Sequence, residues 1–211
     1  MKTLIFAIIL FSAASCNFTR TGAPAERPSG PANTTSATST SPSVPAGESA
    51  VAFGKATPEN SAATAECRKT KVGKYVVIAD QTFAIDFEPF RGSCFLTSKN
   101  PEYDGSPVES EFAIYKNGEK TFDFPQQFNG TGFGCWVEGV AFQDLDKDGL
   151  TDIIIVAKCS GKDATYNESS VYVNTGSEFT TDLDANFKLN GLKKISQVAD
   201  YVKANQKLFF K

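Results

Sequence analysis

Four aspartates alternate with other residues in one short stretch, which reads DxDxDGxxD from residue 144 to residue 152. A tight turn at Gly149 directs alternate carboxylates toward one point. Calcium prefers about six to eight oxygen ligands, and loops of this kind supply them from carboxylates and backbone carbonyls. The stretch therefore predicts a calcium site, with a solvated acidic turn as the alternative. The predicted ligands are Asp144, Asp146, Asp148, the carbonyl of Leu150, and Asp152.

The residues that follow the acidic loop exclude an EF-hand. Ile155 stands at the loop position where an EF-hand has a bidentate glutamate. Residues 153–156 (IIIV) continue as a strand and not as a helix. We therefore expect a structural ion without a helix-opening switch, and calcium in preference to magnesium, which tolerates irregular protein cages poorly.

The surroundings of the loop resemble a known repeat. Residues 139–156 (GVAFQDLDKDGLTDIIIV), residues 171–176 (VYVNTG) and Phe179 are similar to one FG-GAP or VCBS repeat. In those families, hairpins flank a calcium loop in each blade of a propeller. Because this sequence holds one copy where the families hold several, the resemblance implies a single calcium loop in a small β domain and not a large propeller.

The composition excludes several classes of function. The chain has 211 residues and no histidine, which excludes histidine-activated nucleophiles and histidine-ligated metals. Its formal net charge of −3 provides no sign of a basic nucleic-acid footprint. Glu109 with Glu111, or Glu138 with Asp163, are the carboxylate pairs that a glycosidase would need, but their spacing does not indicate a catalytic pair. We therefore expect a protein that is not an enzyme and binds no nucleic acid.

The first sixteen residues are typical of a bacterial export signal. Lys2 precedes the apolar run LIFAIILF at 4–11, which is too short to span about 30 Å of hydrocarbon. The ending AASC at 13–16 resembles the lipobox of bacterial lipoproteins. This resemblance implies lipidation of Cys16 and a membrane anchor, and Asn17 favours the outer membrane, facing the periplasm. An ordinary secretory signal cleaved near Ser15 is the alternative.

Two further regions follow the signal. Residues 17–65 are dominated by Ala, Ser, Thr, Pro and Gly, so we expect a disordered tether. Residues 66–211 are predicted to form one mainly β domain of antiparallel hairpins. The predicted hairpins join 72–79 to 82–89, 111–116 to 119–124 around Asn117-Gly118, 136–142 to 153–157, and 170–173 to 178–181.

The end of the chain has a different periodicity. Apolar residues between 192 and 208 recur near helical spacing and predict one amphipathic helix. The fold class is therefore mainly β: a small disulfide-stapled domain of antiparallel hairpins, either propeller-like or a sandwich, with one C-terminal helix.

Four cysteines remain in the predicted domain, and an exported protein keeps an even set as disulfides. Paired residues of an antiparallel hairpin lie equally far from its turn. Cys67 and Cys94 are centred on Asp80-Gln81, whereas Cys135 and Cys159 are centred on the acidic loop. We therefore predict the pairs Cys67–Cys94 and Cys135–Cys159, each closing the open end of a hairpin.

A small, exported, disulfide-bearing β domain with one calcium loop resembles bacterial periplasmic lysozyme inhibitors and related immunity proteins. Some of these use an SGxxY loop, whose serine and tyrosine bond to the catalytic carboxylates of the enzyme. Here two extra residues separate Ser160-Gly161 from Tyr166. The resemblance implies that Ser160, Gly161 and Tyr166 contact a lysozyme-like hydrolase. A calcium-stabilised glycan- or protein-binding module is the alternative, and the segment 130–134 (GTGFG) is a second candidate contact loop.

Overall fold

The computed structural model describes residues 61–103, 109–131 and 134–211. The expected signal peptide (1–16), its Cys16 and residues 17–60 of the expected tether lie outside the described residues. Residues 61–65, which we expected to end the tether, belong to the folded part. Ser61 caps helix α1 (Ala62–Cys67) by accepting the Thr64 N–H, and Thr64 is buried.

The first sheet is antiparallel and is organised around strand β3 (Ser93–Lys99). β3 pairs on one side with β1 (Val76–Val77) and β2 (Phe83–Ile85), and on the other with β4 (Glu111–Lys116). β5 (Glu119–Asp123) completes the sheet beyond β4.

The expected hairpin between 72–79 and 82–89 is therefore wrong. The single turn of 3-10 helix η1 (Ala79–Gln81) separates its two halves, and both pair with β3 instead of with each other. The reason is burial: Phe83 and Ile85 lie in the core between the sheets, so β2 must lie along β3.

The second sheet has the strand order β6-β7-β8-β9, with every pair antiparallel. Its strands are β6 (Cys135–Gln143), β7 (Asp152–Ser160), β8 (Thr165–Asn174) and β9 (Phe179–Thr180). This order confirms the expected hairpins around the acidic loop and between 170–173 and 178–181. The β4–β5 hairpin is also confirmed, since Asn117 (φ 52°) and Gly118 (φ 84°) adopt the positive φ values of a type I′ turn.

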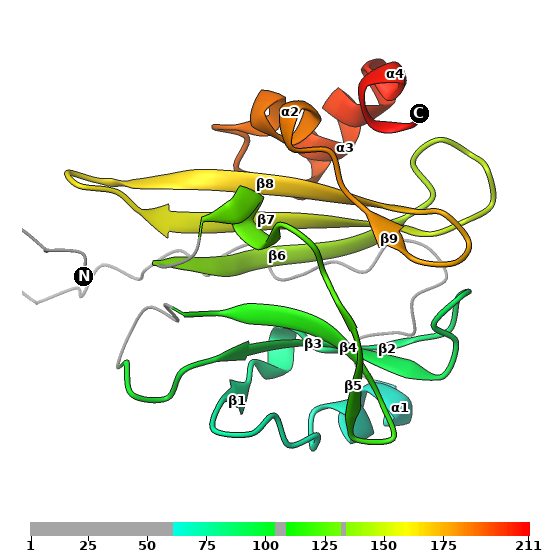
Figure 1. Ribbon diagram of the computed structural model, residues 1–211, viewed down its shortest axis with the longest axis vertical. Coiled ribbons are helices and arrows are strands. Elements are labelled where there is room, and N and C mark those ends of the chain that lie inside the picture. The colour runs from blue at the N-terminus through cyan, green and yellow to red at the C-terminus, as the bar shows by residue number, and fades with distance from the viewer. Residues whose placement is uncertain (1–60, 104–108, 132–133) are drawn as a thin grey trace, which may run out of the picture. The chain divides into compact units, whose positions relative to one another are not determined.

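The two sheets pack face to face (Figure 1), so the domain is the sandwich of the two expected arrangements. Aromatic rings fill the space between them. The Phe95 and Phe142 ring centroids are 5.6 Å apart, and those of Phe124 and Tyr172 are 4.9 Å apart. Edge-to-face packing of this kind contributes beyond simple burial of apolar area.

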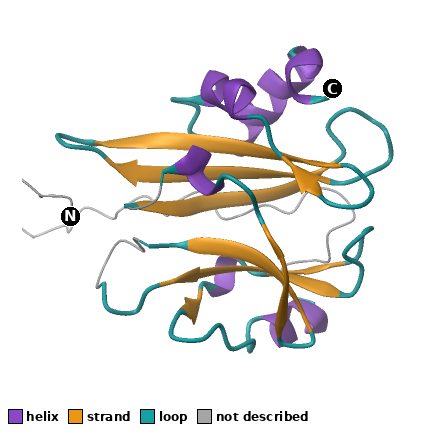
Figure 2. Cartoon of the chain, viewed as in Figure 1, coloured by secondary structure: helices purple, strands orange, loops and turns teal. Residues whose placement is uncertain are grey.

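Helices cover the outer faces of both sheets (Figure 2). α1 packs on the first sheet, where Cys67, Ala84 and Leu96 are buried together. The second sheet is covered by α2 (Leu183–Asn186), the 3-10 helix η3 (Phe187–Leu189), α3 (Ile195–Ala204) and α4 (Gln206–Phe209).

The single helix expected over 192–208 is interrupted. Asn205 (φ −130°, ψ 35°) separates α3 from α4, and its side chain donates to the Tyr201 carbonyl. The interruption turns Phe209 into the core beside the second sheet, whereas Leu208, expected on the apolar face, is 40% exposed. Packing of one aromatic ring thus overrides the helical periodicity.

Both predicted disulfides are confirmed, one for a different reason than expected. Cys135 and Cys159 are direct cross-strand partners of β6 and β7. Cys67 is instead in α1, and its bridge to Cys94 of β3 attaches that helix to the first sheet.

Candidate functional site

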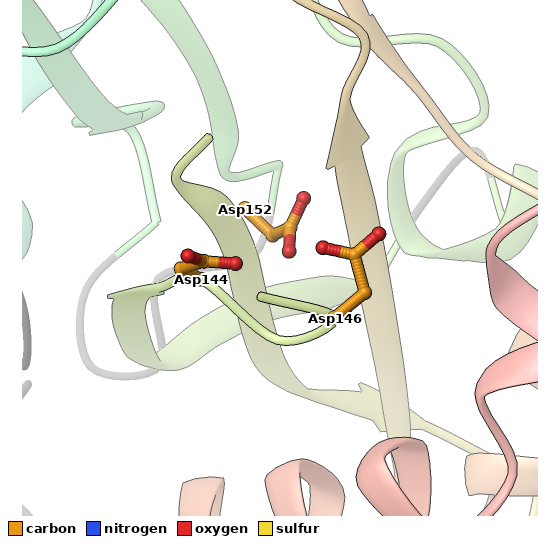
Figure 3. A group of neighbouring side chains, drawn as sticks. All are labelled: Asp144, Asp146 and Asp152. Atoms are coloured by element: carbon orange, nitrogen blue, oxygen red, sulfur yellow. The ribbon is translucent and has the colours of Figure 1, made fainter. Parts of the chain in front are cut away.

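The acidic loop joins β6 to β7 at one end of the second sheet. One carboxylate oxygen from each of Asp144, Asp146 and Asp152 lies within 4.8 Å of the others. Figure 3 shows these three carboxylates directed toward a shared space, which we call the aspartate trio. Two of its members come from the loop, and Asp152 is the first residue of β7.

Asp152 is the fixed member of the trio. It is 2% exposed, its Oδ2 accepts the Leu145 N–H and its Oδ1 accepts the Asn174 N–H, both at 3.0 Å. These bonds attach the carboxylate to the loop on one side and to the end of β8 on the other. Its position is therefore set by the sheet.

The loop holds its own carboxylates by a series of tight turns. Asp144 accepts the N–H groups of Lys147 (2.8 Å) and Gly149 (3.0 Å). Asp146 accepts the Asp148 N–H at 3.1 Å. Lys147 (φ 72°) and Gly149 (φ 90°) both have left-handed backbone conformations, which the glycine adopts without strain.

Asp148, a predicted ligand, lies outside the trio. Its Oδ1 accepts the Leu150 N–H at 2.7 Å, and its side chain is exposed. Leu150, whose carbonyl was the other predicted ligand, is partly buried next to it. The geometry thus brings together three of the four predicted carboxylates.

Burial and mutual repulsion disfavour the charged form of this site. Burial raises the pKa of Asp152 to about 7, although the N–H groups of Asn174 and Leu145 oppose the shift. Burial also raises the pKa of Asp146, and the charges of Asp148 and Asp144 add to the rise. A bound cation reverses this balance because it stabilises ionised carboxylates. The trio can therefore hold a metal ion.

Asn174 is a residue of this site that sequence reasoning missed. Its N–H bonds Asp152, and its buried side-chain amide donates to the carbonyls of Glu88 (2.7 Å) and Thr151 (3.2 Å). Its Oδ1 accepts the Gly176 N–H at 2.9 Å. The sequence Asn174-Thr-Gly176 at the β8–β9 connection could have indicated Asn174, because an asparagine two residues before a glycine is typical of a turn that the asparagine side chain caps.

The second predicted site lies at the opposite end of β7. Ser160 ends β7, residues 161–164 form the turn, and Tyr166 lies early in β8. Residues 160–166 are all exposed, and Tyr166 as a whole residue is 42% exposed. The structure thus gathers Ser160, Gly161 and Tyr166 on one exposed hairpin.

This hairpin has a rigid base. The Cys135–Cys159 bridge precedes Ser160 directly, and the Ser160 N–H donates to the Gly134 carbonyl at 2.8 Å. The Gly161 N–H closes the turn on the Ala164 carbonyl at 2.9 Å. Across the nine residues of β7, the hairpin and the aspartate trio are separated by roughly 26 Å at the rise of a β-strand.

The carboxylates considered for a glycosidase lie in three places. Glu109 and Glu111 line one cavity near the start of β4. Glu138 sits at a β-bulge of β6, where Trp136 Nε1 donates to it at 3.2 Å and Lys158 Nζ lies 3.9 Å away. Asp163 lies in the β7–β8 turn.

Two disulfides indicate an extracytoplasmic location. Within the part of the chain that the structure describes, no helix is both long and apolar enough to cross a membrane.

Compared with known proteins, the chain matches no family model, no curated protein and no solved structure.

Proposed function

We propose that this chain is a lipid-anchored, non-catalytic binding protein of the bacterial envelope, and that its β7–β8 hairpin inhibits a lysozyme-like peptidoglycan hydrolase. The observation that carries the proposal is the exposed hairpin of residues 160–166 with a disulfide at its base. A hairpin fixed in this way loses little conformational entropy on binding.

The chemistry of the hairpin suits a carboxylate-lined cleft. The Ser160 hydroxyl and the Tyr166 phenol are hydrogen-bond donors. Ser160 pairs with Thr165 across the hairpin, so the side chains of Ser160 and Tyr166 point to its two opposite faces. Glycosidases place two carboxyl groups in their cleft. Donors on a projecting hairpin can therefore bond to the groups that the enzyme uses for catalysis.

The aspartate trio serves this proposal as a calcium site that stabilises the far end of the sandwich. Calcium binds oxygens at about 2.3–2.6 Å, so two ligands on opposite sides of the ion are about 5 Å apart. The spacing within the trio, at most 4.8 Å, fits that sphere. Waters and backbone carbonyls would supply the remaining ligands.

The N-terminal anchor rests on the sequence of residues 1–16, where the small residues before Cys16 resemble a lipobox. Lipoproteins carry more than one acyl chain, and two or more chains hold a protein firmly on a membrane. The extracytoplasmic location indicated by the disulfides supports this assignment.

The experiment is an inhibition titration of a lysozyme-like hydrolase with the full chain. The expected result is loss of turnover at a one-to-one ratio, with Tyr166→Ala weakening inhibition about 30-fold, the size of an interface hot spot. Phe187→Ala is the matched control, because that aromatic residue is also exposed (49%) but lies in the helical layer that covers the second sheet. Equal effects of the two variants would contradict the role of the hairpin.

One observation favours a second function, calcium-dependent glycan binding. A cavity of about 580 Å³ adjoins the acidic loop, and Asp146, Asp148 and Thr175 are among its lining residues. A calcium ion in the trio would leave coordination positions for the hydroxyl groups of a sugar. Binding of oligosaccharides that chelator abolishes, without inhibition of any hydrolase, would support this function over the first.

A further inference from the structure

The helices that cover the second sheet carry charge of the opposite sign to the rest of the domain. We call residues 183–211, which contain α2, η3, α3 and α4, the helical layer. This layer has six lysines and two aspartates, a net charge of +4, whereas the described residues before it have 18 acidic and 11 basic side chains. Positive charge is therefore concentrated in one layer of an acidic chain, an asymmetry that indicates an anionic partner.

The lysines lie on the solvent side of this layer. Figure 1 shows α2, α3 and α4 together on the side of the second sheet that faces away from the first sheet. Ile195, Val198, Val202 and Phe209 are buried against the second sheet. All six lysines are exposed: Lys188, Lys193, Lys194, Lys203, Lys207 and Lys211.

The acidic groups gather at one edge of the layer, around Lys211. Lys211 forms an ion pair with Asp182. The hydrogen bond and the charge of Asp182 raise the pKa of Lys211, and the charge of Asp184 adds to the rise. Lys211 also lines the cavity beside the acidic loop, together with Asp146 and Asp148. We therefore leave Lys211 out of the basic surface.

The other lysines keep their charge available. Among the described residues, none of them forms an ion pair. Lys193 shares a cavity with Glu138, but the Lys158 ammonium lies 3.9 Å from that carboxylate and offsets it. Asp200 is the remaining acidic residue of the layer. We call the following five residues the basic face: Lys188, Lys193, Lys194, Lys203 and Lys207.

Two large apolar residues are exposed next to these lysines. Phe187 is 49% exposed and precedes Lys188, and Leu208 is 40% exposed and follows Lys207. Surfaces that bind at a membrane interface combine these two features. Lysines attract anionic headgroups, and apolar side chains enter the boundary between the headgroups and the acyl chains.

We propose that the basic face docks this domain on an anionic phospholipid membrane, with Phe187 and Leu208 inserted among the headgroups. The five lysines belong to η3, α3, α4 and the segment before α3. They are therefore distributed along the layer, as suits the distributed charge of a headgroup surface. A soluble acidic partner would not require the exposed apolar pair.

This inference goes beyond the proposed lipid anchor and inhibitory hairpin. An acyl chain at Cys16 would hold the chain near a membrane without orienting the domain, whereas the basic face would set its orientation. The β7–β8 hairpin lies at one end of the second sheet and outside the helical layer. Docking would therefore leave the hairpin free to meet a soluble enzyme.

The test measures which face of the domain approaches the lipid. The full chain carrying Cys16→Ala, which cannot be acylated at that position, is mixed with lipid nanodiscs that contain a gadolinium-chelate lipid. The discs are phosphatidylcholine, either alone or with about 30% phosphatidylglycerol as the anionic lipid. On the anionic discs, the amide signals of Lys188, Lys203 and Leu208 should broaden more than those of Lys71 and Val76, beside the first sheet. This difference should disappear on neutral discs.

Paired variants separate the basic face from net charge. Lys203→Gln combined with Lys207→Gln should weaken binding to anionic discs about 25-fold, at about fivefold for each lysine. Lys71→Gln combined with Lys74→Gln removes the same charge from exposed positions between α1 and β1 and should leave binding nearly unchanged. Equal losses from the two pairs would show that net charge alone acts, and would overturn the proposal.

Apolar variants distinguish a membrane from a soluble polyanion. Leu208→Ala should weaken binding to anionic discs about fivefold, because part of an aliphatic side chain no longer leaves water. Binding to heparin without binding to discs would overturn the proposal in favour of an acidic macromolecule. Equal broadening of both faces on the anionic discs would also overturn it.

The same variants keep this proposal separate from the inhibition of a hydrolase. Phe187→Ala should weaken docking and leave inhibition in solution unchanged. Tyr166→Ala should weaken inhibition and leave docking unchanged. A failure of one proposal would thus be visible without a failure of the other.

Discussion

Replacing Asp146 with alanine should abolish the stabilisation of the fold by calcium without damaging the fold itself. Asp146 is partly exposed and belongs to the aspartate trio, and its carboxylate accepts a backbone N–H of its own loop. Its removal relieves repulsion with Asp144 and Asp152 in the metal-free protein. The variant should therefore melt in chelator at the temperature of the native chain or slightly above it.

The size of the effect follows from ligand linkage. Loops of extracellular modules bind calcium with dissociation constants of about 10⁻⁴–10⁻³ M. At about 2 mM free calcium, binding to the native state alone then contributes about 0.6–1.8 kcal/mol to the free energy of unfolding. For a domain of this size, this raises the melting temperature by about 1–7 °C.

The variant Asp152→Asn distinguishes loss of metal binding from damage to the fold itself. An amide has a single oxygen, so one of the N–H groups of Leu145 and Asn174 would lose its acceptor. A buried unpaired donor costs about 1–3 kcal/mol, and this variant should melt lower even in chelator.

Differential scanning calorimetry of the three proteins, each with calcium and with chelator, measures both effects. Native melting that is indifferent to calcium, or an Asp146→Ala variant that keeps the full calcium shift, would refute a metal role for the trio.

Three further outcomes are expected. Gly161→Ala should disrupt the β7–β8 turn and abolish hydrolase inhibition while the rest of the fold survives, because the new Cβ would lie 2.5 Å from the Ala164 carbonyl oxygen; inhibition assays and backbone NMR check this. Lys211→Ala should raise the pKa of Asp182, which the hydrogen bond from Lys211 now lowers. The stability from this pair is present above the unfolded pKa of the Asp182 carboxyl group and is lost as the pH falls through its folded pKa. A carboxyl NMR titration of the variant should therefore show a higher midpoint for Asp182 than in the native chain. The free energy of unfolding of the variant should also fall less in acid. Cys16→Ala should remove the protein from the detergent phase on partitioning, whereas unchanged partitioning would contradict the lipid anchor.

Several elements could be predicted because their causes are local. Asn117-Gly118 specifies a type I′ turn through the positive φ of two neighbouring residues. The Cys135–Cys159 pair follows from the same principle, since the acidic loop fixes the register of the two strands beside it. The aspartate spacing indicated a metal site for the same reason, because a short loop can converge its own carboxylates.

Other elements could not be predicted because their partners are distant in sequence. The sequences of β1 and β2 resemble the two strands of one hairpin, but both strands pair with β3. This pairing buries Phe83 and Ile85 in the core between the sheets. The end of the helix at Asn205 depends on Phe209 reaching a core formed by other elements.

The sequence by itself determined the turn chemistry, the alternation of the long strands and the acidic loop, since each depends on residues within a few positions of one another. Only the tertiary structure decided which carboxylate is buried. Asp152 differs from Asp148 because the Asn174 N–H, 22 residues away, holds it against the sheet. The tertiary structure also placed the trio and the exposed hairpin at opposite ends of β7 and brought Glu111 and Gly130 to one cavity. These placements result from the packing of two sheets, and the spacing of residues within a short segment carries no information about that packing.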